Sequence, residues 1–112
     1  DSGAAAAAAL LDAEPDLTAI AALNDVMAIG ALNMLRARGV AVPGQISVVG
    51  FDDMPIAQDV VPALTTVRLP LADIGARAME LALDPTFNGA PRVEEVPAVL
   101  VRRDSVATPA HR

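Results

Sequence analysis

The sequence predicts a three-layer α/β fold built on a mainly parallel sheet. Short β-branched segments alternate along the 112 residues with longer Ala- and Leu-rich segments of helical periodicity. Hydrophobic residues make up 54% of the chain, which is enough to fill a core. One β-branched segment, residues 46–51, ends in the adjacent carboxylates Asp52 and Asp53. Ligands of open α/β sheets bind at the carboxyl ends of strands, so these two residues are the first candidates for a binding site.

The first half of the chain is expected to alternate helix and strand. Its elements are a helix over residues 1–13, a strand over 18–23, a helix over 26–38, a turn over 42–45 and a strand over 46–51. Asp1 or Ser2 can cap the first helix, whose alanines have the highest helix propensity. Asn24 or Asp25 can cap the second helix, and Gly39 suits the position that follows it. The strand–helix–strand unit that results predicts a parallel pair of strands.

The second half is expected to be less regular. A loop over residues 52–62, with one helical turn at 54–59, precedes a strand over 64–68, a helix over 71–83, a loop over 84–92, a strand over 93–101 and a fraying tail over 102–112. Pro70 suits the start of the last helix, because proline is tolerated where no backbone donor is needed. The apolar face of that helix consists of Leu71, Ile74, Ala78 and Leu81.

Two polar pairs are expected to meet at one edge of the sheet. Asn24-Asp25 ends the first strand and Asp52-Asp53 ends the second, and neighbouring strands lie about 4.8 Å apart. An amide donates and accepts, while a carboxylate accepts from two donors, which suits the vicinal diol of a sugar or a nucleoside. Simpler roles stay open, with Asp25 as a helix cap, Asp52 as a turn residue and Asp53 in an Asx turn. A hard-cation site formed by the three acids is a weaker alternative.

Composition argues against catalysis and nucleic-acid contact by this chain. The adjacent acids would point apart and cannot flank a substrate as glycosidase carboxylates do. The single histidine, His111, lies in the predicted tail, and no serine occupies a nucleophile elbow. The chain has no cysteine, and neither a metal nor a cofactor is implied. A net charge of −6, arginines without lysine and the absence of Trp and Tyr disfavour a phosphate-binding or base-stacking surface.

Several motifs follow one another in a fixed order. They are TAIAALND over residues 18–25, MAIGAL over 27–32, VPGQISVVGFDD over 42–53, PALTTVR over 62–68, IGARA over 74–78 and LVRRDS over 100–105. With these motifs the chain resembles the lactose-repressor (LacI/GalR) family of bacterial transcription regulators over nearly its whole length. Two positions depart from the pattern. Ala63 stands where many members have a second proline, and Leu69 where many have glutamine.

The resemblance implies a periplasmic-binding-protein-like type I fold, of which this chain is a fragment, mostly the C-terminal lobe. Residues 1–68 and 92–105 would belong to that lobe, residues 69–91 would form a crossover helix toward the N-terminal lobe, and residues 106–112 would be a tail. The chain is therefore expected to be the C-terminal portion of a sugar or effector sensor. The helix-turn-helix headpiece of the family, and most of the N-terminal lobe, would lie outside it.

The resemblance also implies roles for individual residues. Asp52 and Asn24 would line the effector cleft, Asp25 would be a helix cap and cleft neighbour, and Leu71 would pack against the effector. Hinge motion between the lobes would pass through Arg68, Leu69 and Pro70. Dimer contacts would involve Ile29, Asn33, Ile56 and Val60.

These implications predict a cytoplasmic, non-enzymatic regulator that binds a small-molecule effector, expected to be a carbohydrate, and forms a homodimer. It would bind operator DNA only through the missing headpiece and would not contact a membrane, since no apolar run reaches about 18 residues. A fragment of a periplasmic sugar-binding protein of a transport system is the alternative. The Asp52-Asp53 pair followed by LTTVR favours the regulator, because the transport relatives often end this strand in a single Asp.

Overall fold

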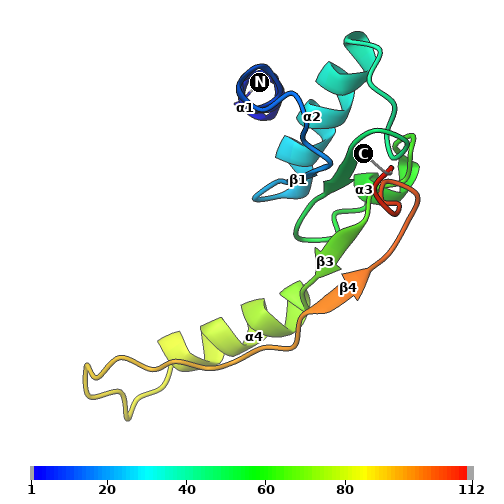
Figure 1. Cartoon of the computed structure of the whole chain (residues 1–112). Helices are drawn as coiled ribbons and strands as arrows, with labels where there is room; N and C mark the ends of the chain where they lie inside the picture. The colour runs from blue at the N-terminus through cyan, green and yellow to red at the C-terminus, as the bar shows by residue number, and fades with distance from the viewer. Residues whose placement is uncertain (1, 111–112) are drawn as a thin grey trace.

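The structure is a computed structural model that describes residues 2–110, so Asp1 and His111 lie outside the described residues. Its elements follow in the order α1 (Ser2–Ala13), β1 (Ala19–Ala21), α2 (Asp25–Ala37), β2 (Ser47–Val49), α3 (Ile56–Asp59), β3 (Thr66–Arg68), α4 (Leu71–Ala82) and β4 (Val99–Val101). This order confirms the predicted α/β class. Figure 1 shows a body that contains α1, α2, α3, β1 and β2, and an arm, residues 69–98, that β3 and β4 connect to it.

The body is organised around the parallel pair β1 and β2, which the strand–helix–strand pattern predicts. Ile20 lies opposite Val48 in this pair. On the other edge of β2, Val49 forms a parallel β-bridge with Thr65. The Val48 amide also donates to the Ser105 carbonyl on that edge at 2.9 Å. Strand β2 is therefore the central strand of the body, and its carboxyl end has neighbours on both sides.

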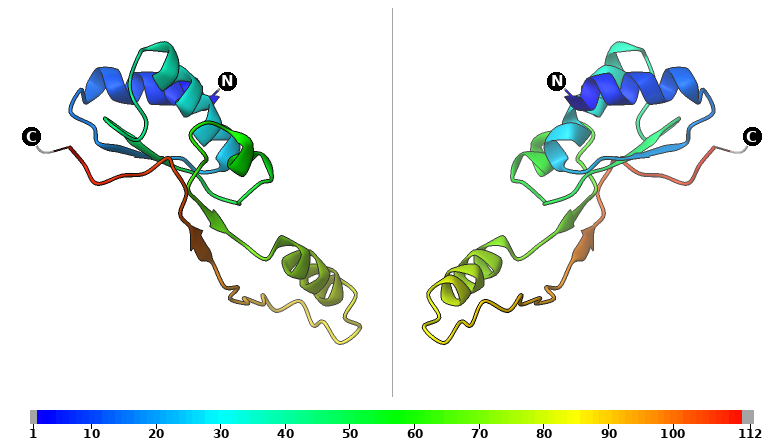
Figure 2. Two further views of the ribbon diagram at one scale, coloured as in Figure 1. Left: turned by 90° about the vertical axis from the view of Figure 1, so that its right-hand side faces the viewer. Right: turned by 90° about the vertical axis from the view of Figure 1, so that its left-hand side faces the viewer.

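Helices α1 and α2 pack on each other, and Figure 2 shows them on one side of the strands of the body. Small residues allow a close approach, because a Cβ on Gly3 would overlap the backbone of Met27. The core consists of aliphatic side chains, among which Leu35, Val48 and Leu64 are fully buried. Both phenylalanines of the chain are exposed. Burial of aliphatic surface therefore holds the body together.

The arm extends away from the body, and the molecule measures 57 × 25 × 25 Å along its principal axes (Figure 2). Strands β3 and β4 pair antiparallel. Helix α4 has no buried residue. Two ion pairs hold the returning chain in place, between Arg77 and Glu94 at 2.6 Å and between Arg92 and Asp84 at 2.8 Å. Among the described residues, the predicted apolar face of α4 has no core to join.

The strands are shorter than predicted. The largest difference concerns the predicted strand over residues 93–101, of which only Val99–Val101 pairs with another strand. The residues before Val99 run beside α4 without a partner strand (Figure 2). Strand propensity alone does not make a strand, because the backbone N–H and C=O groups also need partners on a neighbouring strand. Helix α1 begins at Ser2, so Ser2 is its first residue rather than its cap.

The prediction of a fraying tail is wrong for the residues that directly follow β4. Ser105 is fully buried. Its hydroxyl donates to the Val48 carbonyl at 2.6 Å and accepts from the Thr65 amide at 2.8 Å. Farther along, the Ala107 amide donates to the Ser47 hydroxyl at 3.1 Å. Residues 105–107 are therefore hydrogen-bonded beside β2 instead of fraying.

Candidate functional site

The carboxyl ends of β1 and β2 lie side by side, as their parallel order predicts. Beyond the two strands, the Asp25 amide donates to the Phe51 carbonyl at 2.9 Å. This bond keeps the two chain segments together after the sheet ends, with Asn24 on one segment and Asp52 on the other. We call this edge, formed by Asn24 and Asp52, the ligand edge.

Asn24 is the N-cap of α2. Its backbone is extended, with φ −155° and ψ 171°, and its side-chain oxygen accepts from the Met27 amide at 2.8 Å. The prediction that Asp25 caps this helix is wrong, because Asp25 is already the first residue of α2. Capping uses only the oxygen of the Asn24 amide. The NH2 group of Asn24 has two donors that can serve a ligand at this edge.

Asp25 is fully buried and bonds inside the body. One carboxylate oxygen accepts from the Thr66 hydroxyl at 2.6 Å and the other from the Met54 amide at 2.7 Å. These bonds join the start of α2 to β3 and to the loop after β2. Glycine is required at Gly50, since a Cβ there would overlap an Asp25 oxygen and lie 2.9 Å from Leu64 Cδ2. A direct contact of Asp25 with a ligand stays a prediction.

Asp52 combines an unusual backbone with an available carboxylate. Its φ is 112°, which non-glycine residues rarely adopt, and its amide donates to the Val67 carbonyl of β3 at 2.9 Å. The residue is half-buried, and no group within residues 2–110 donates a hydrogen bond to its carboxylate. Strained backbone of this kind persists where the surrounding structure imposes it, often at ligand sites. The Asp52 carboxylate can therefore accept two donors from a ligand.

Asp53 forms ion pairs with two arginines. Its carboxylate oxygens lie 2.6 Å from Arg68 Nε and 2.6 Å from Arg103 Nη2, and its side chain is 8% exposed. Burial would raise the pKa of this carboxyl, but the hydrogen bonds and charges of Arg68 and Arg103 outweigh burial and hold the pKa below its usual value. The predicted Asx turn is wrong, because the side chain bonds to residues 15 and 50 positions away.

Thr66 and Arg103 are not among the predicted site residues, although both bond to acids of this region. Thr66 lies 41 positions from Asp25, and Arg103 lies 50 positions from Asp53. No local pattern encodes such pairings. The sequence offers one signal for the ion pairs. Arginines stand at the end of β3 and after β4, and acids stand after β2.

The predicted hinge lies where the body meets the arm. Arg68 is the last residue of β3, Leu69 follows it, and Pro70 precedes α4 without a side-chain cap bond. Leu71 is the first residue of α4 and is 55% exposed. Within the part of the chain that the structure describes, β3 and β4 connect the arm to the body. Motion at residues 68–70 and a ligand contact of Leu71 stay predictions.

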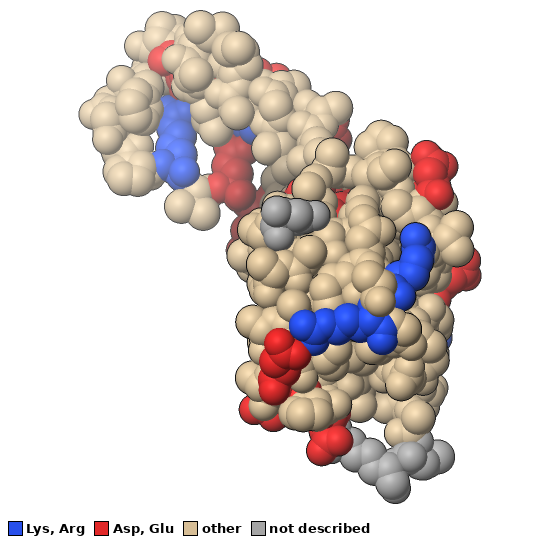
Figure 3. Space-filling view, turned by 90° about the horizontal axis from the view of Figure 1, so that it is seen from above, with Lys and Arg blue, Asp and Glu red and all other residues tan. Residues whose placement is uncertain are grey.

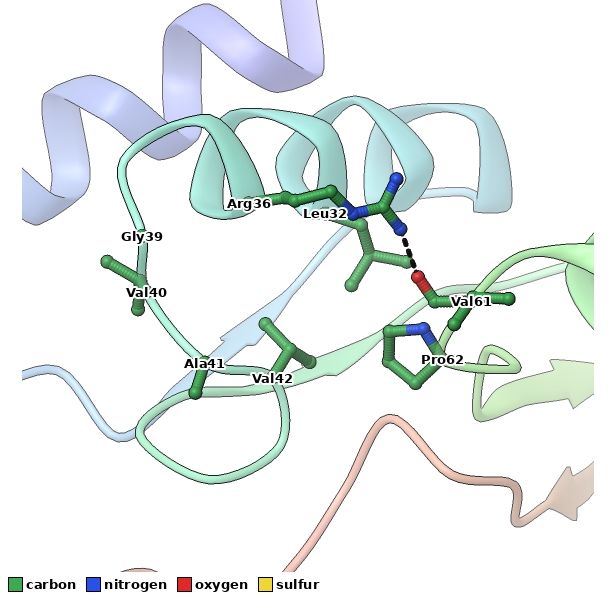
Figure 4. Close-up of a pocket in the computed structure, with 8 residues that line it drawn as sticks. All are labelled: Leu32, Arg36, Gly39, Val40, Ala41, Val42, Val61 and Pro62. Atoms are coloured by element: carbon green, nitrogen blue, oxygen red, sulfur yellow. Dashed lines mark hydrogen bonds between the residues drawn. The ribbon is translucent and has the colours of Figure 1, made fainter.

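The predicted dimer residues lie on α2 and around α3. Asn33 and Ile56 are exposed, whereas Ile29 and Val60 are half-buried against the core. Next to them is a hollow of about 510 Å³, lined by the end of α2, the turn after it and Val61-Pro62 (Figure 4). The side chain of Arg36 extends toward this hollow and donates to the Val61 carbonyl. The hollow is separate from the ligand edge, and the dimer role stays a prediction.

Charged side chains form no metal-binding group within residues 2–110 and no basic stripe on the face drawn in Figure 3. Within residues 2–110, no three His, Cys, Asp or Glu side chains are grouped so as to hold a metal ion. No helix in the same range has the length and hydropathy to cross a membrane. On the face in Figure 3, basic side chains are few and are interspersed with acidic ones. That face lacks the dense positive charge of a phosphate-backbone surface.

Comparison with known proteins identifies relatives of this fold. A model of the periplasmic binding protein-like domain family matches residues 1–106. The HTH-type transcriptional regulator GalR of Escherichia coli (strain K12) is 45% identical over 103 residues, which cover 90% of this chain and 30% of GalR. A solved sugar-binding transcriptional regulator of the LacI family from Escherichia coli, complexed with phosphate, is 40% identical with a TM-score of 0.78, over 96% of this chain and 39% of that one. The transcriptional regulator CelR in complex with cellobiose is 36% identical with a TM-score of 0.84, over 94% of this chain and 33% of that one.

The chain spans about a third of the length of the curated relatives that it matches. The family match nevertheless covers almost all of the chain. The solved relatives share its fold at identities of 40% and 36%. The chain therefore belongs to the periplasmic binding protein-like domain family, in the form that LacI-type transcriptional regulators contain.

Proposed function

We propose that this chain is the effector-sensing and dimerising part of a bacterial LacI-family regulator that acts in the cytoplasm without catalysing a reaction. The longer protein binds a small sugar or nucleoside-like ligand at the ligand edge and at a second lobe outside this chain. Ligand binding shifts the balance between arrangements of the two lobes. That shift changes the affinity of an attached headpiece for operator DNA.

The ligand edge carries this proposal. Asn24 has amide donors that its cap bond does not use, and Asp52 has a carboxylate that no described group satisfies. The Asp25–Phe51 hydrogen bond holds the two residues at the ends of adjacent strands. A donor and an acceptor so placed match two neighbouring hydroxyls of a sugar. The CelR relative contains cellobiose, which supports a carbohydrate as the ligand class.

The substitution Asp52→Ala tests the proposal in the longer protein. We expect it to abolish binding of the sugar that the wild type binds in a calorimetric panel of galactose, lactose, cellobiose and ribonucleosides. Asp104→Ala is the matched control, because Asp104 is exposed and lies beside Ala63, at the opposite end of β3. Unchanged sugar affinity in Asp52→Ala would remove Asp52 from the site. A wild type that binds no member of the panel would argue against sensing of this ligand class.

The dimer proposal rests on exposed side chains of α2 and α3. Ile56 is 45% exposed on α3, and of the other predicted contact residues Asn33 on α2 is exposed and Val60 is half-buried. A buried charge without a partner is costly, so Ile56→Asp should convert a dimer to a monomer in sedimentation equilibrium. Leu10→Asp is the matched control, because Leu10 is 46% exposed on α1. Equal dissociation of both variants, or of neither, would contradict this interface.

A further inference from the structure

We propose that the Asp53 cluster, defined as Asp53, Arg68 and Arg103, transmits the state of the ligand edge to the two strands that connect the body to the arm. The proposal rests on the proposed function, because it assigns positioning residues to the same site. The cluster acts through Asp52, and none of its three side chains has to touch the ligand.

Asp53 is coupled to Asp52 through the backbone. The two residues share a peptide unit, and both have positive φ, 112° at Asp52 and 56° at Asp53. The Asp52 amide donates to the Val67 carbonyl at 2.9 Å, and the Asp53 amide lies 3.3 Å from the Thr66 hydroxyl that accepts from it. Both amides are therefore bonded to β3. A ligand that pulls on the Asp52 carboxylate therefore pulls on backbone that β3 holds at two successive amides.

The side chain of Asp53 is bonded to both connecting strands. Arg68 is the last residue of β3, through which the chain leaves the body. Arg103 stands two positions after the end of β4, through which the chain returns. Arg103 is fixed further, since its guanidinium donates to the Leu64 carbonyl at 2.8 Å. One carboxylate therefore joins the loop that carries Asp52 to the exit and the return of the arm.

The two ion pairs of the cluster differ in their exposure to solvent. The side chains of Asp53 and Arg103 are 8% and 15% exposed, whereas that of Arg68 is 58% exposed. Breaking the buried pair would leave the largely buried guanidinium of Arg103 without its carboxylate, so Asp53 and Arg103 stay together. The pair with Arg68 is screened by solvent and can open and close at little cost. Arg68 is thus the movable member, and it stands directly before the predicted hinge residues Leu69 and Pro70.

The coupling test uses the full-length protein that contains this chain. Galactose, lactose and cellobiose serve as probes, together with a DNA duplex that the wild type selects from a random pool. For Arg68→Gln we expect sugar affinity within about threefold of wild type. The sugar-induced change in DNA affinity should shrink by roughly 2- to 30-fold, the range by which residues between coupled sites alter coupling. Arg102→Gln is the control, because Arg102 is an exposed arginine that follows β4 directly. A change in DNA affinity that stays at its wild-type size in Arg68→Gln overturns the proposal.

Hydrogen exchange tests, without a ligand, whether the Asp53 cluster holds the loop that carries Asp52. In Asp53→Asn we expect the Asp52 amide, which donates to Val67, to exchange about tenfold faster, since its loop loses both arginines. The Ala28 amide in α2, which donates to Asn24, should speed up less, by no more than the loss of global stability that urea unfolding of Asp53→Asn measures. Equal acceleration at Asp52 and Ala28 would mean a general loss of stability and would overturn the assignment. A wild type that binds none of the three sugars and no ribonucleoside would contradict the proposed function, while this exchange result would still show whether the cluster holds the loop of Asp52.

Discussion

The body and the arm of this molecule are held by different forces. In the body, Leu35 of α2, Val48 of β2 and Leu64 are fully buried. In the arm, α4 has no buried residue, and Leu83 at its end is 72% exposed. Hydrophobic burial accounts for the body, whereas the arm depends on helix propensity and on ion pairs at the surface. The arm therefore has regular secondary structure but no buried residue in its helix.

The electrostatics of the two regions differ in the same way. In the arm, the Asp84 pKa is lowered to about 2 by the Thr86 hydroxyl and amide and by Arg92. These groups lie within eight positions of Asp84. In the body, the pKa of Asp53 is lowered despite burial, by arginines 15 and 50 positions away. The groups that lower the pKa of Asp84 are thus nearby in sequence, whereas those that lower the pKa of Asp53 are farther away.

The largest expected difference between body and arm concerns leucines. Leu35→Ala should destabilise the body by about 2–5 kcal/mol, because it empties a closely packed site. Leu83→Ala in the arm should change stability by less than about 0.5 kcal/mol, because the side chain is exposed. Urea unfolding of the 112-residue chain measures both. If Leu83→Ala becomes costly in the longer protein, a second lobe covers the arm there.

Glycine substitutions should have opposite signs in the two regions. A Cβ on Gly50 would overlap an Asp25 oxygen, so Gly50→Ala should destabilise the body by about 1–3 kcal/mol. Gly75 lies within α4 with no atom near its Cβ position, so Gly75→Ala should stabilise the helix by about 1 kcal/mol. Thermal unfolding followed by circular dichroism, with hydrogen exchange along α4, separates the two effects. Equal signs would contradict the contrast between a packed body and an open arm.

The pH dependence of the body should include a contribution from Asp53. Its folded-state pKa is lowered, so the stability that it contributes is present above the usual pKa of about 3.9 and is lost as the pH falls through the folded-state value. Asp53→Asn should therefore be less stable than wild type at pH 7, and the gap should narrow below pH 4. Urea unfolding at several pH values measures the gap. A constant gap between pH 7 and pH 3 would mean that the Asp53 charge is not stabilising.

The smallest expected effect concerns the ion pairs of the arm. Arg77 bonds Glu94 on the returning chain and Glu80 on its own helix, and all three side chains are partly exposed. Arg77→Met should speed hydrogen exchange along the arm at low salt, and the effect should fade at about 1 M salt, where charges are screened within about 3 Å. Exchange in α2 is the internal reference. An effect that is independent of salt would indicate packing of the arginine stem instead.

Prediction from sequence succeeded in the body where the signal is local. The alternation of strands and helices, the parallel pair β1 and β2, and the left-handed Gly39 after α2 are confirmed. The shared edge of Asn24 and Asp52 followed from the parallel order alone. The choice of cap failed, because Asn24 and Asp25 have similar capping propensity and the buried partners of Asp25 decide between them.

The failures of prediction share one physical cause. Among the described residues, the β-branched segment before Val99 has no partner strand, whereas Ser105 after β4 is hydrogen-bonded to Val48 and Thr65. Whether a segment becomes a strand depends on neighbours that arrive from far along the chain. The same holds for Asp53, whose Asx-turn prediction was wrong because two distant arginines compete for its carboxylate.

Local patterns in the sequence were enough to predict the order of helices and strands and the edge at which Asn24 and Asp52 meet, because periodicity and the short helical connection between β1 and β2 are local. The burial of Asp25, the pairing of Asp53 with Arg68 and Arg103, and the availability of the Asp52 carboxylate depend on the tertiary structure. These assignments depend on which side chains come within hydrogen-bond distance after β3 and β4 pack beside β2. No periodic pattern in the sequence predicts such long-range contacts.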